Sequence, residues 1–291
     1  MLLPRGILEE KLRNILAEDV GQGDVTTALV VPENSVAQAV LVAREKGVVA
    51  GIEEARILLE SLQLETKILV SDGEKVRPGQ KIMKISGNTR NILSSERTVL
   101  NIMSRMSGIA TATRFIVEKL HEAKVKTKVA CTRKTAPGLL YFDKKAVLVG
   151  GGDTHRLHLD DLVLIKDNHV AVVGSVEEAV RRAKQHASFT KKIEVEVANA
   201  EDVLVAATAG ADVIMLDNFS LEQVEKALAL LKKTGLYGKV MIEVSGGITS
   251  ENVLEYAGTQ VDVVSIGEIT NSAKALDIGL DITVTTRTTL N

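Results

Sequence analysis

The chain has 291 residues, of which 45% are hydrophobic and 25% charged, and this composition is typical of a folded globular protein rather than a disordered one. The formal net charge of −2 excludes a general attraction to nucleic acid or anionic membrane, so a local basic cluster must hold any anionic ligand. The single cysteine, Cys131, excludes an intramolecular disulfide bond, and the lack of a signal-peptide core or membrane-length apolar run predicts a cytoplasmic protein.

The first 110 residues are expected to form a small mixed sheet with helices on one side. Apolar residues recur at helical spacing in residues 7–18 and 53–62, which predicts two helices. A segment rich in turn-forming residues, 71–79, separates two of the strand-like runs. Strands are predicted at residues 36–43, 48–50, 66–70 and 81–85.

A long helix is predicted next, beginning at Ser94. Serine often caps the start of a helix, and apolar residues recur at helical spacing from Val99 to Met106. This start places Arg97 in the first turn, where a cation is unfavourable by roughly 0.3–1 kcal/mol. We therefore expect an anion near Arg97, on a ligand or on a partner subunit.

From about residue 125 strands and helices alternate, which is typical of a parallel sheet closed, or nearly closed, into a barrel. Six or seven strands can be counted, so an incomplete barrel fits as well as a complete one, and a doubly wound open sheet is the alternative. The strands are predicted at residues 128–132, 162–165, 193–197, 212–216, 240–244 and 261–266. Helices are predicted between them at residues 176–186, 200–209, 221–233 and 250–256.

Polar residues or glycines follow these strands, or lie in them, in all six cases. The carboxyl ends of strands carry the chemistry in β/α barrels, so the repetition predicts a functional site there. In chain order the residues are Thr132, Arg133 and Lys134; Lys166; Glu194 and Glu196; Asp217; Ser245, Gly246 and Gly247; and Gly267.

Four basic residues, Arg133, Lys134, Arg156 and Lys166, make up a cluster suited to a small polyanion such as a dicarboxylate. Three glycines, residues 150–152, precede Arg156 and allow the backbone to bend. His155 could donate a hydrogen bond to a carboxylate or a ring nitrogen, with a purely structural role as the alternative.

Two carboxylates, Glu196 and Asp217, are hard oxygen ligands suited to Mg²⁺, although they could instead balance the nearby lysines. The Ser245–Gly247 run and Gly267 are similar to phosphate-binding loops after the last strands of barrels. Together these features predict a phosphorylated sugar, a metal-bound diphosphate and an acidic acceptor as substrates.

The order and spacing of these motifs resemble the quinolinate phosphoribosyltransferase family, the carboxylating nicotinate-nucleotide pyrophosphorylases. The resemblance extends from the Gly-Asp-Val-Thr-Thr turn at residues 23–27 through to Gly267. Other matching segments are residues 96–101, 107–111, 132–138, 150–156, 164–169, 194–197, 216–218 and 243–248.

The resemblance implies an α/β fold with two domains. An N-terminal α/β sandwich domain at residues 1–110, joined by the C-terminal segment 276–291, would accompany an open, about seven-stranded α/β barrel at residues 111–275. It also implies a homodimer in which the N-terminal domain of one subunit caps the barrel of the other. The implied reaction transfers phosphoribose from 5-phosphoribosyl-1-diphosphate to quinolinate with Mg²⁺, and yields nicotinate mononucleotide, diphosphate and CO₂ for NAD biosynthesis.

The resemblance also implies roles for individual residues. Lys134, Glu196 and Asp217 would act in catalysis, with Lys134 near the diphosphate and the two carboxylates serving the metal and the ribose. Arg97 would reach into the neighbouring subunit's site. The quinolinate carboxylates would be held by Arg133, His155, Arg156 and Lys166, and the 5-phosphate by Ser245, Gly246 and Gly267, with Thr132, Gly247 and Asn271 as further substrate contacts.

Three positions depart from the family pattern. Asn271 stands where many relatives have a phosphate-contacting histidine, Thr154 where asparagine is common, and Cys131 where aspartate is frequent. These departures weaken single assignments and leave the family resemblance intact.

Two other functions stay open at this point. The chain could be a phosphoribosyltransferase on the same scaffold that acts on nicotinate or another acceptor, or a non-catalytic barrel that binds sugar phosphates. Four basic residues favour a dicarboxylate acceptor over nicotinate, and the presence of both Glu196 and Asp217 argues against a non-catalytic role.

Overall fold

The computed structural model describes residues 3–284 and divides into two units. The first unit comprises Met1–Ala112, Tyr141–Gly150 and Ala273–Asn291, and the second comprises Thr113–Leu140 and Gly151–Ser272. Residues 285–291 of the predicted C-terminal segment lie outside the described part of the chain. None of the helices found in residues 3–284 is both long enough and apolar enough to cross a membrane.

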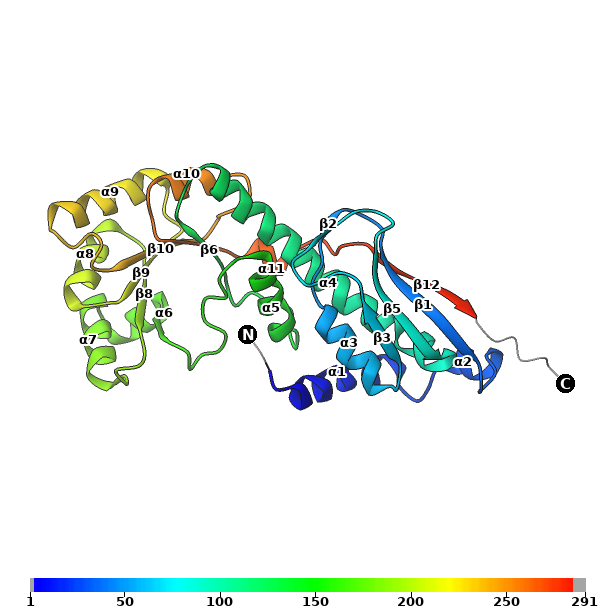
Figure 1. Ribbon diagram of the computed structural model, residues 1–291. Helices are drawn as coiled ribbons and strands as arrows, with labels where there is room; N and C mark the ends of the chain where they lie inside the picture. The colour runs from blue at the N-terminus through cyan, green and yellow to red at the C-terminus, as the bar shows by residue number, and fades with distance from the viewer. Residues whose placement is uncertain (1–2, 285–291) are drawn as a thin grey trace. The chain divides into compact units, whose positions relative to one another are not determined.

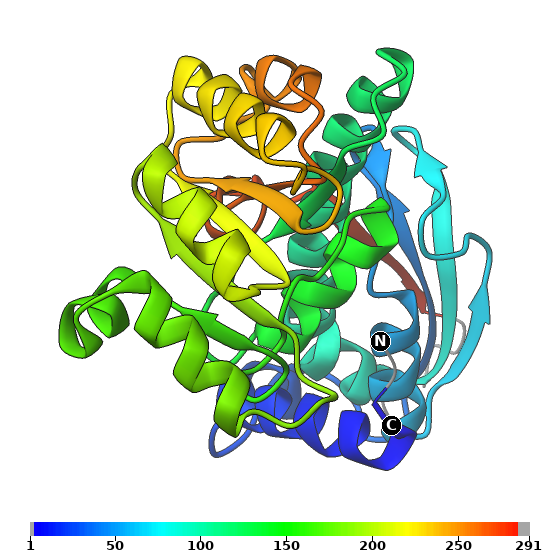
Figure 2. The same cartoon turned by 90° about the vertical axis from the view of Figure 1, so that its left-hand side faces the viewer.

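A four-stranded antiparallel sheet forms the centre of the first unit, in the order β12-β1-β5-β3. β12, from the C-terminal segment, pairs with β1 from Ala37 to Ala43. Figure 1 shows α3 and the first half of α4 on one face of this sheet, and Figure 2 shows the same layers from the side. The strands are β1 Val36–Ala43, β3 Glu65–Ile68, β5 Lys81–Asn88 and β12 Ile278–Val284, with a small pair, β2 Gly47–Val48 and β4 Lys75–Val76. The helices are α1 Arg5–Val20, α2 Val25–Val30 and α3 Ile52–Ser61.

The long helix α4, Thr89–Glu122, begins five residues before the predicted start. Its N-terminal cap is Asn88, whose side-chain oxygen accepts hydrogen bonds from the backbone N–H groups of Arg90 (2.9 Å) and Asn91 (3.3 Å). The prediction that Ser94 caps the helix is therefore wrong. Arg97 is the ninth residue of α4 rather than a first-turn residue, so the helix dipole imposes no cost on its charge.

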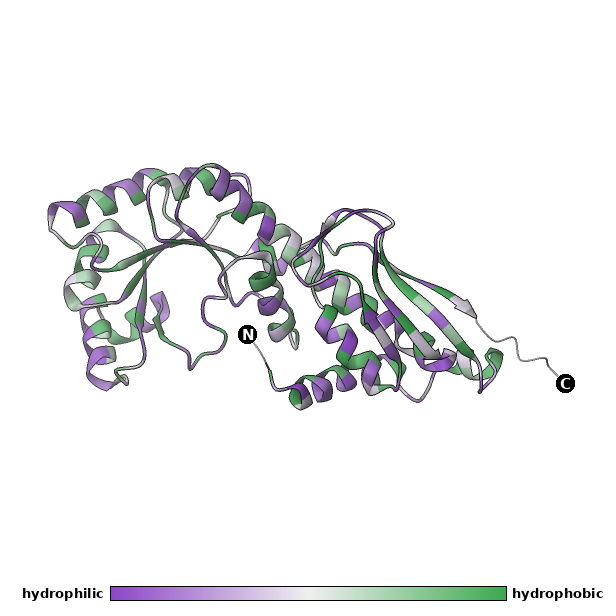
Figure 3. Cartoon of the chain, viewed as in Figure 1, coloured by the Kyte–Doolittle hydropathy of each residue, from purple (hydrophilic) through white to green (hydrophobic). Residues whose placement is uncertain are grey.

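Six parallel strands form the sheet of the second unit, in the order β6-β11-β10-β9-β8-β7. The six predicted strands are confirmed, with ends that agree within two residues. Apolar side chains fill these strands because both faces are covered, and Figure 3 shows them as the most hydrophobic part of this unit. The strands are β6 Lys128–Cys131, β7 Val163–Ile165, β8 Ile193–Val197, β9 Val213–Asp217, β10 Met241–Ser245 and β11 Val263–Ile266.

Helices cover the outside of this sheet (Figure 1), and three of them match the predicted ranges. These are α7 Val176–His186, α8 Ala200–Ala209 and α9 Leu221–Lys233, whereas α10 Val253–Gly258 begins three residues later than expected. Two further helices of this unit, α6 Asp167–Val173 and α11 Glu268–Asn271, were not predicted. The helix α5 Leu140–Gly150, which was also not predicted, belongs to the first unit apart from Leu140.

The sheet is an open barrel, and a single residue extends it at one edge. Asp153 pairs with β6, since its N–H donates to the Val129 carbonyl (2.7 Å) and its carbonyl accepts from the Cys131 N–H (3.0 Å). The chain then runs to Val163, the first residue of β7 at the opposite edge of the sheet. The segment between them, residues 154–162, thus connects the two edges of the open barrel and carries His155 and Arg156.

Candidate active site

A cavity of about 590 Å³ lies at the carboxyl ends of the strands in the second unit. It brings together eleven of the predicted site residues, which come from five strand ends and from the segment between the sheet edges. They are Thr132, Arg133, Lys134, His155, Arg156, Lys166, Glu196, Asp217, Ser245, Gly246 and Gly247.

Two other predicted residues, Gly267 and Asn271, lie next to this group. A side-chain carbon added to Gly267 would be 3.4 Å from Lys134 Cδ and 3.7 Å from Asn271 Nδ2. The Thr270 hydroxyl donates to the Lys134 carbonyl (2.9 Å), which ties α11 to the loop after β6. Gly267 and Asn271 are therefore placed beside the lysine that is expected to serve the diphosphate.

Arg97 belongs to the first unit, where its side chain is exposed on α4. Within residues 3–284 it forms no hydrogen bond or ion pair. Its predicted contact with the site of a partner subunit stays a prediction.

Arg156 is 7% exposed, yet no carboxylate among the described residues forms an ion pair with it. Burial, together with the nearby positive charge of Arg133, lowers the pKa of Arg156. Taking a guanidinium out of water without a counterion is costly, and a bound anion would remove that cost. The two arginines thus make one side of the cavity basic, and their predicted contact with the substrate carboxylates stays a prediction.

The acidic side of the cavity contains Glu196 and Asp217. Lys166 Nζ donates to Glu196 Oε1 (2.6 Å) and forms an ion pair with it. Asp217 accepts a hydrogen bond from Asn218 Nδ2 (2.9 Å). Mg²⁺ favours one or two carboxylates together with water and phosphate oxygens, and this donor set fits such an ion. The two residues are therefore suited to hold a metal ion that also contacts a diphosphate.

The loop after β10 requires glycine. Gly246 has φ +85°, and a side-chain carbon there would lie 2.3 Å from Asn218 Oδ1 and 2.9 Å from the Asn218 nitrogen. The Asn218 N–H donates to the Ser245 carbonyl (2.9 Å), which holds the loops after β9 and β10 together. A glycine backbone at this point leaves room for a ligand to approach.

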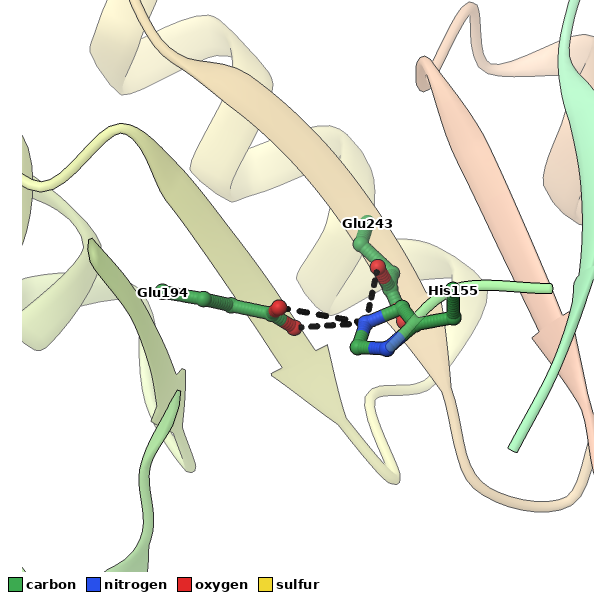
Figure 4. Close-up of side chains that lie close together, drawn as sticks. All are labelled: His155, Glu194 and Glu243. Carbon is green, nitrogen blue, oxygen red and sulfur yellow. Dashed lines mark hydrogen bonds and ion pairs between the residues drawn. The ribbon is translucent and has the colours of Figure 1, made fainter. Parts of the chain in front are cut away.

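A buried cluster adjoins the basic wall of the cavity. His155 Nε2 lies 3.1 Å from Glu194 Oε2 and 3.3 Å from Glu243 Oε2, and Figure 4 shows the ring nitrogen facing both carboxylates. His155 Nδ1 accepts the N–H of Arg156 (2.7 Å). Both ring nitrogens are thus engaged with protein groups, and the predicted contact of His155 with a substrate carboxylate stays a prediction.

This cluster holds an extra proton. Burial alone would lower the pKa of His155, but its hydrogen bonds to Glu194 and Glu243 outweigh burial and raise that pKa to about 10. Burial and the negative charge of Glu243 also raise the pKa of Glu194. Since Nδ1 accepts a hydrogen bond, the ring proton that the raised pKa of His155 retains lies on Nε2, which faces the two carboxylates. The three groups have ligand atoms within 4.8 Å of one another.

The stability of the protein is expected to fall as pH rises from about 7 to 10. In this range the folded protein keeps the cluster proton while the unfolded chain, whose histidine titrates near pH 6.5, has lost it, so the loss should approach about 1.4 kcal/mol per pH unit. Urea denaturation at several pH values measures this slope. His155→Gln should flatten it, and an equal slope in that variant would contradict the assignment.

Sequence reasoning missed the roles of Glu194, Glu243 and Asn218. A signal was available for Glu243, because a glutamate inside the buried run Met241–Ser245 requires a polar partner in the interior. His169, which had no assigned role, accepts the Lys166 N–H at Nδ1 (2.9 Å) and so caps α6.

Comparisons with known proteins agree with this geometry. The family model "Quinolinate phosphoribosyl transferase, C-terminal domain" matches residues 109–281, and the corresponding N-terminal domain model matches residues 24–107.

The chain is 44% identical over 271 residues to a probable nicotinate-nucleotide pyrophosphorylase [carboxylating] of Methanothermobacter thermautotrophicus, covering 93% of this chain and 97% of that protein. It is 39% identical to the rat enzyme of that name, covering 97% of this chain and 93% of that protein. A crystal structure of NadC from Streptococcus pyogenes has a TM-score of 0.90 at 37% identity, covering 98% of this chain and 99% of that one. The chain therefore belongs to the quinolinate phosphoribosyltransferase family.

Proposed function

We propose that the protein transfers phosphoribose from 5-phosphoribosyl-1-diphosphate to quinolinate and releases nicotinate mononucleotide, diphosphate and CO₂, as a step of NAD biosynthesis. The observation that carries this proposal is the pair of guanidinium groups at one wall of the cavity, of which Arg156 is buried and forms no ion pair with a carboxylate of residues 3–284. A single-carboxylate acceptor such as nicotinate would leave part of this positive charge unmatched.

The basic wall binds the acceptor. Arg133 and Arg156 present planar forks that suit carboxylates, and Lys166 adds a compact charge that is shared with Glu196. This arrangement orients quinolinate so that its ring nitrogen faces the ribose. Holding the two reactants in line lowers the entropic cost of the reaction.

The acidic wall serves the phosphoribosyl group. When C1 of the ribose loses its bond to diphosphate, positive charge develops on the sugar, and the carboxylates of Glu196 and Asp217 stabilise it. A Mg²⁺ ion held by these two residues, directly or through water, would supply charge to neutralise the diphosphate. Lys134, after β6, adds a further positive charge for the same leaving group.

The remaining steps need little from the protein. The pyridine nitrogen of quinolinate forms the new bond to C1, and the ring becomes cationic. The carboxylate next to that nitrogen then leaves as CO₂, and the electron pair of the broken C–C bond stays on the ring carbon until a proton replaces it. The 5-phosphate of the sugar is held by Ser245, Gly246, Gly247, Gly267 and Asn271, with Thr132 near the loop that carries Lys134.

Incubation with quinolinate and 5-phosphoribosyl-1-diphosphate, with and without Mg²⁺, tests the proposal. Nicotinate mononucleotide and CO₂ are expected in equal amounts with the metal, and chelation is expected to stop the reaction. No product in the presence of Mg²⁺ would overturn the proposed function. Turnover of nicotinate in place of quinolinate would instead favour the related phosphoribosyltransferase.

In this proposal the protein acts as a homodimer, and each active site contains residues of both subunits. Arg97 from one subunit completes the active site of the other. The side chain of Arg97 is exposed and forms no hydrogen bond or ion pair within the described residues, which supports this role. The cytoplasmic location expected from the sequence stays a prediction.

Arg97→Ala is expected to abolish activity without unfolding the protein, because its side chain makes no contact in residues 3–284. Mixing it with inactive Lys166→Ala under subunit exchange should restore activity, since one of the two sites in a mixed dimer then has both residues. Activity and circular dichroism of the separate and mixed variants check this. Mixed dimers that form but stay inactive would argue against a shared site.

A further inference from the structure

A histidine clamp, which we define as His155, Glu194 and Glu243, joins three separate parts of the second unit. His155 comes from the segment between the sheet edges, Glu194 from β8 and Glu243 from β10. Both carboxylates are buried, at 1% and 2% exposed, and Glu194 Oε1 also lies 3.2 Å from His155 Nε2. The clamp therefore attaches the crossing segment to two interior strands of the barrel.

The clamp continues directly into Arg156. The Arg156 N–H donates to His155 Nδ1, so the orientation of the ring and that of the Arg156 peptide group are fixed together. His155 also has a left-handed backbone with φ +53°, which costs a non-glycine residue of the order of 1 kcal/mol or more. The surroundings must hold such a conformation: Asp153 Oδ1 accepts the backbone N–H of His155 (2.8 Å), and Glu194 and Glu243 hold its ring.

Glu243 carries a cost that stability does not explain. Its second oxygen, Oε1, is buried and has no hydrogen-bond partner within residues 3–284. An unsatisfied buried acceptor destabilises a fold by about 1–3 kcal/mol. Glu243 lines the cavity, and residues of binding sites are commonly less favourable for stability than other residues would be. Its unsatisfied oxygen therefore indicates a functional role.

We infer that Glu243 is a positioning residue for acceptor binding: with Glu194 it fixes His155, and through His155 it sets the backbone from which Arg156 reaches the dicarboxylate. This inference rests on the proposed function. It predicts that loss of the Glu243 charge weakens binding of the acceptor and leaves the phosphoribosyl donor unaffected.

Glu243→Gln keeps the side-chain shape and removes the charge. The expected result is a rise in KM for quinolinate of about 10- to 100-fold, the usual cost of removing a group that orients a binding residue. The KM for 5-phosphoribosyl-1-diphosphate should be unchanged. Calorimetric titration with benzene-1,2-dicarboxylate, which has the two carboxylates but no ring nitrogen, should show the same loss of affinity without any turnover.

Glu225→Gln is the matched control, since Glu225 is exposed on α9 in the same unit and should behave as wild type. Glu243→Asp restores the charge on a shorter side chain and should recover part of the affinity. This variant replaces Glu243→Gln in the experiment if the glutamine variant does not fold. Wild-type affinity for the dicarboxylate in both Glu243 variants would overturn the inference. So would a parallel rise of both KM values with a lower melting temperature, which indicates a purely structural role. A wild-type protein that does not turn over quinolinate at all would instead overturn the proposed function.

Discussion

Arg156→Ala is expected to lower kcat/KM for quinolinate by about 30- to 5,000-fold, the equivalent of roughly 2–5 kcal/mol. The guanidinium of Arg156 is largely removed from water, and no carboxylate within residues 3–284 forms an ion pair with it, so its charge can be neutralised by the substrate. The loss should appear mainly in KM, because the residue binds the acceptor before and during the reaction. Steady-state kinetics with each substrate varied in turn measures it.

Three variants sharpen this experiment. Arg156→Lys keeps the charge but loses the planar fork, and should be intermediate between wild type and alanine. Arg182→Ala removes an exposed arginine from α7 and should behave as wild type. Arg156→Ala should also have a higher free energy of unfolding than wild type, or an equal one, because it removes a desolvated charge. A strongly destabilised but fully active Arg156→Ala protein would contradict an anion-binding role.

The barrel strands and the site residues on them could be predicted because two independent patterns coincide there. Parallel strands covered on both faces are continuous apolar runs, and such runs are easily located in sequence. Polar residues at the carboxyl end of such a strand are not needed for its packing. Lys166, Asp217 and Ser245 could therefore be identified as candidate site residues. The cavity in the structure brings these three residues together.

The histidine clamp could not be predicted, because its geometry depends on long-range contacts. His155 precedes Glu194 by 39 residues and Glu243 by 88, and the chain itself does not show that they meet. Glu194 and Glu196 are two residues apart in β8 and so lie on one face of the strand, yet the two carboxylates have different partners, His155 and Lys166.

The start of α4 and the whole of α5 were missed for local reasons. Asn88 and Ser94 are equally good capping residues, and only the pairing of β5 as far as Asn88 decides between them. In α5 the residues Asp143, Lys144 and Lys145 are all buried, so the helix has no polar face and its sequence shows no amphipathic period.

That burial of charge in α5 makes Asp143 the position with the largest expected effect on stability. Asp143 is 0% exposed, and both of its carboxylate oxygens accept hydrogen bonds from Arg105 of α4, each at 2.7 Å. Bidentate pairs of this kind are strong, and removal of one partner leaves the other charge partly desolvated. Asp143→Ala should therefore lower the free energy of unfolding by about 3–5 kcal/mol.

Urea denaturation at fixed protein concentration measures this change, and an exposed ion pair in the same unit provides the control. Arg5 and Glu60 are 2.8 Å apart with largely accessible side chains, so Arg5→Ala should cost about 0–1 kcal/mol. A cost for Asp143→Ala as small as that of Arg5→Ala would contradict the argument.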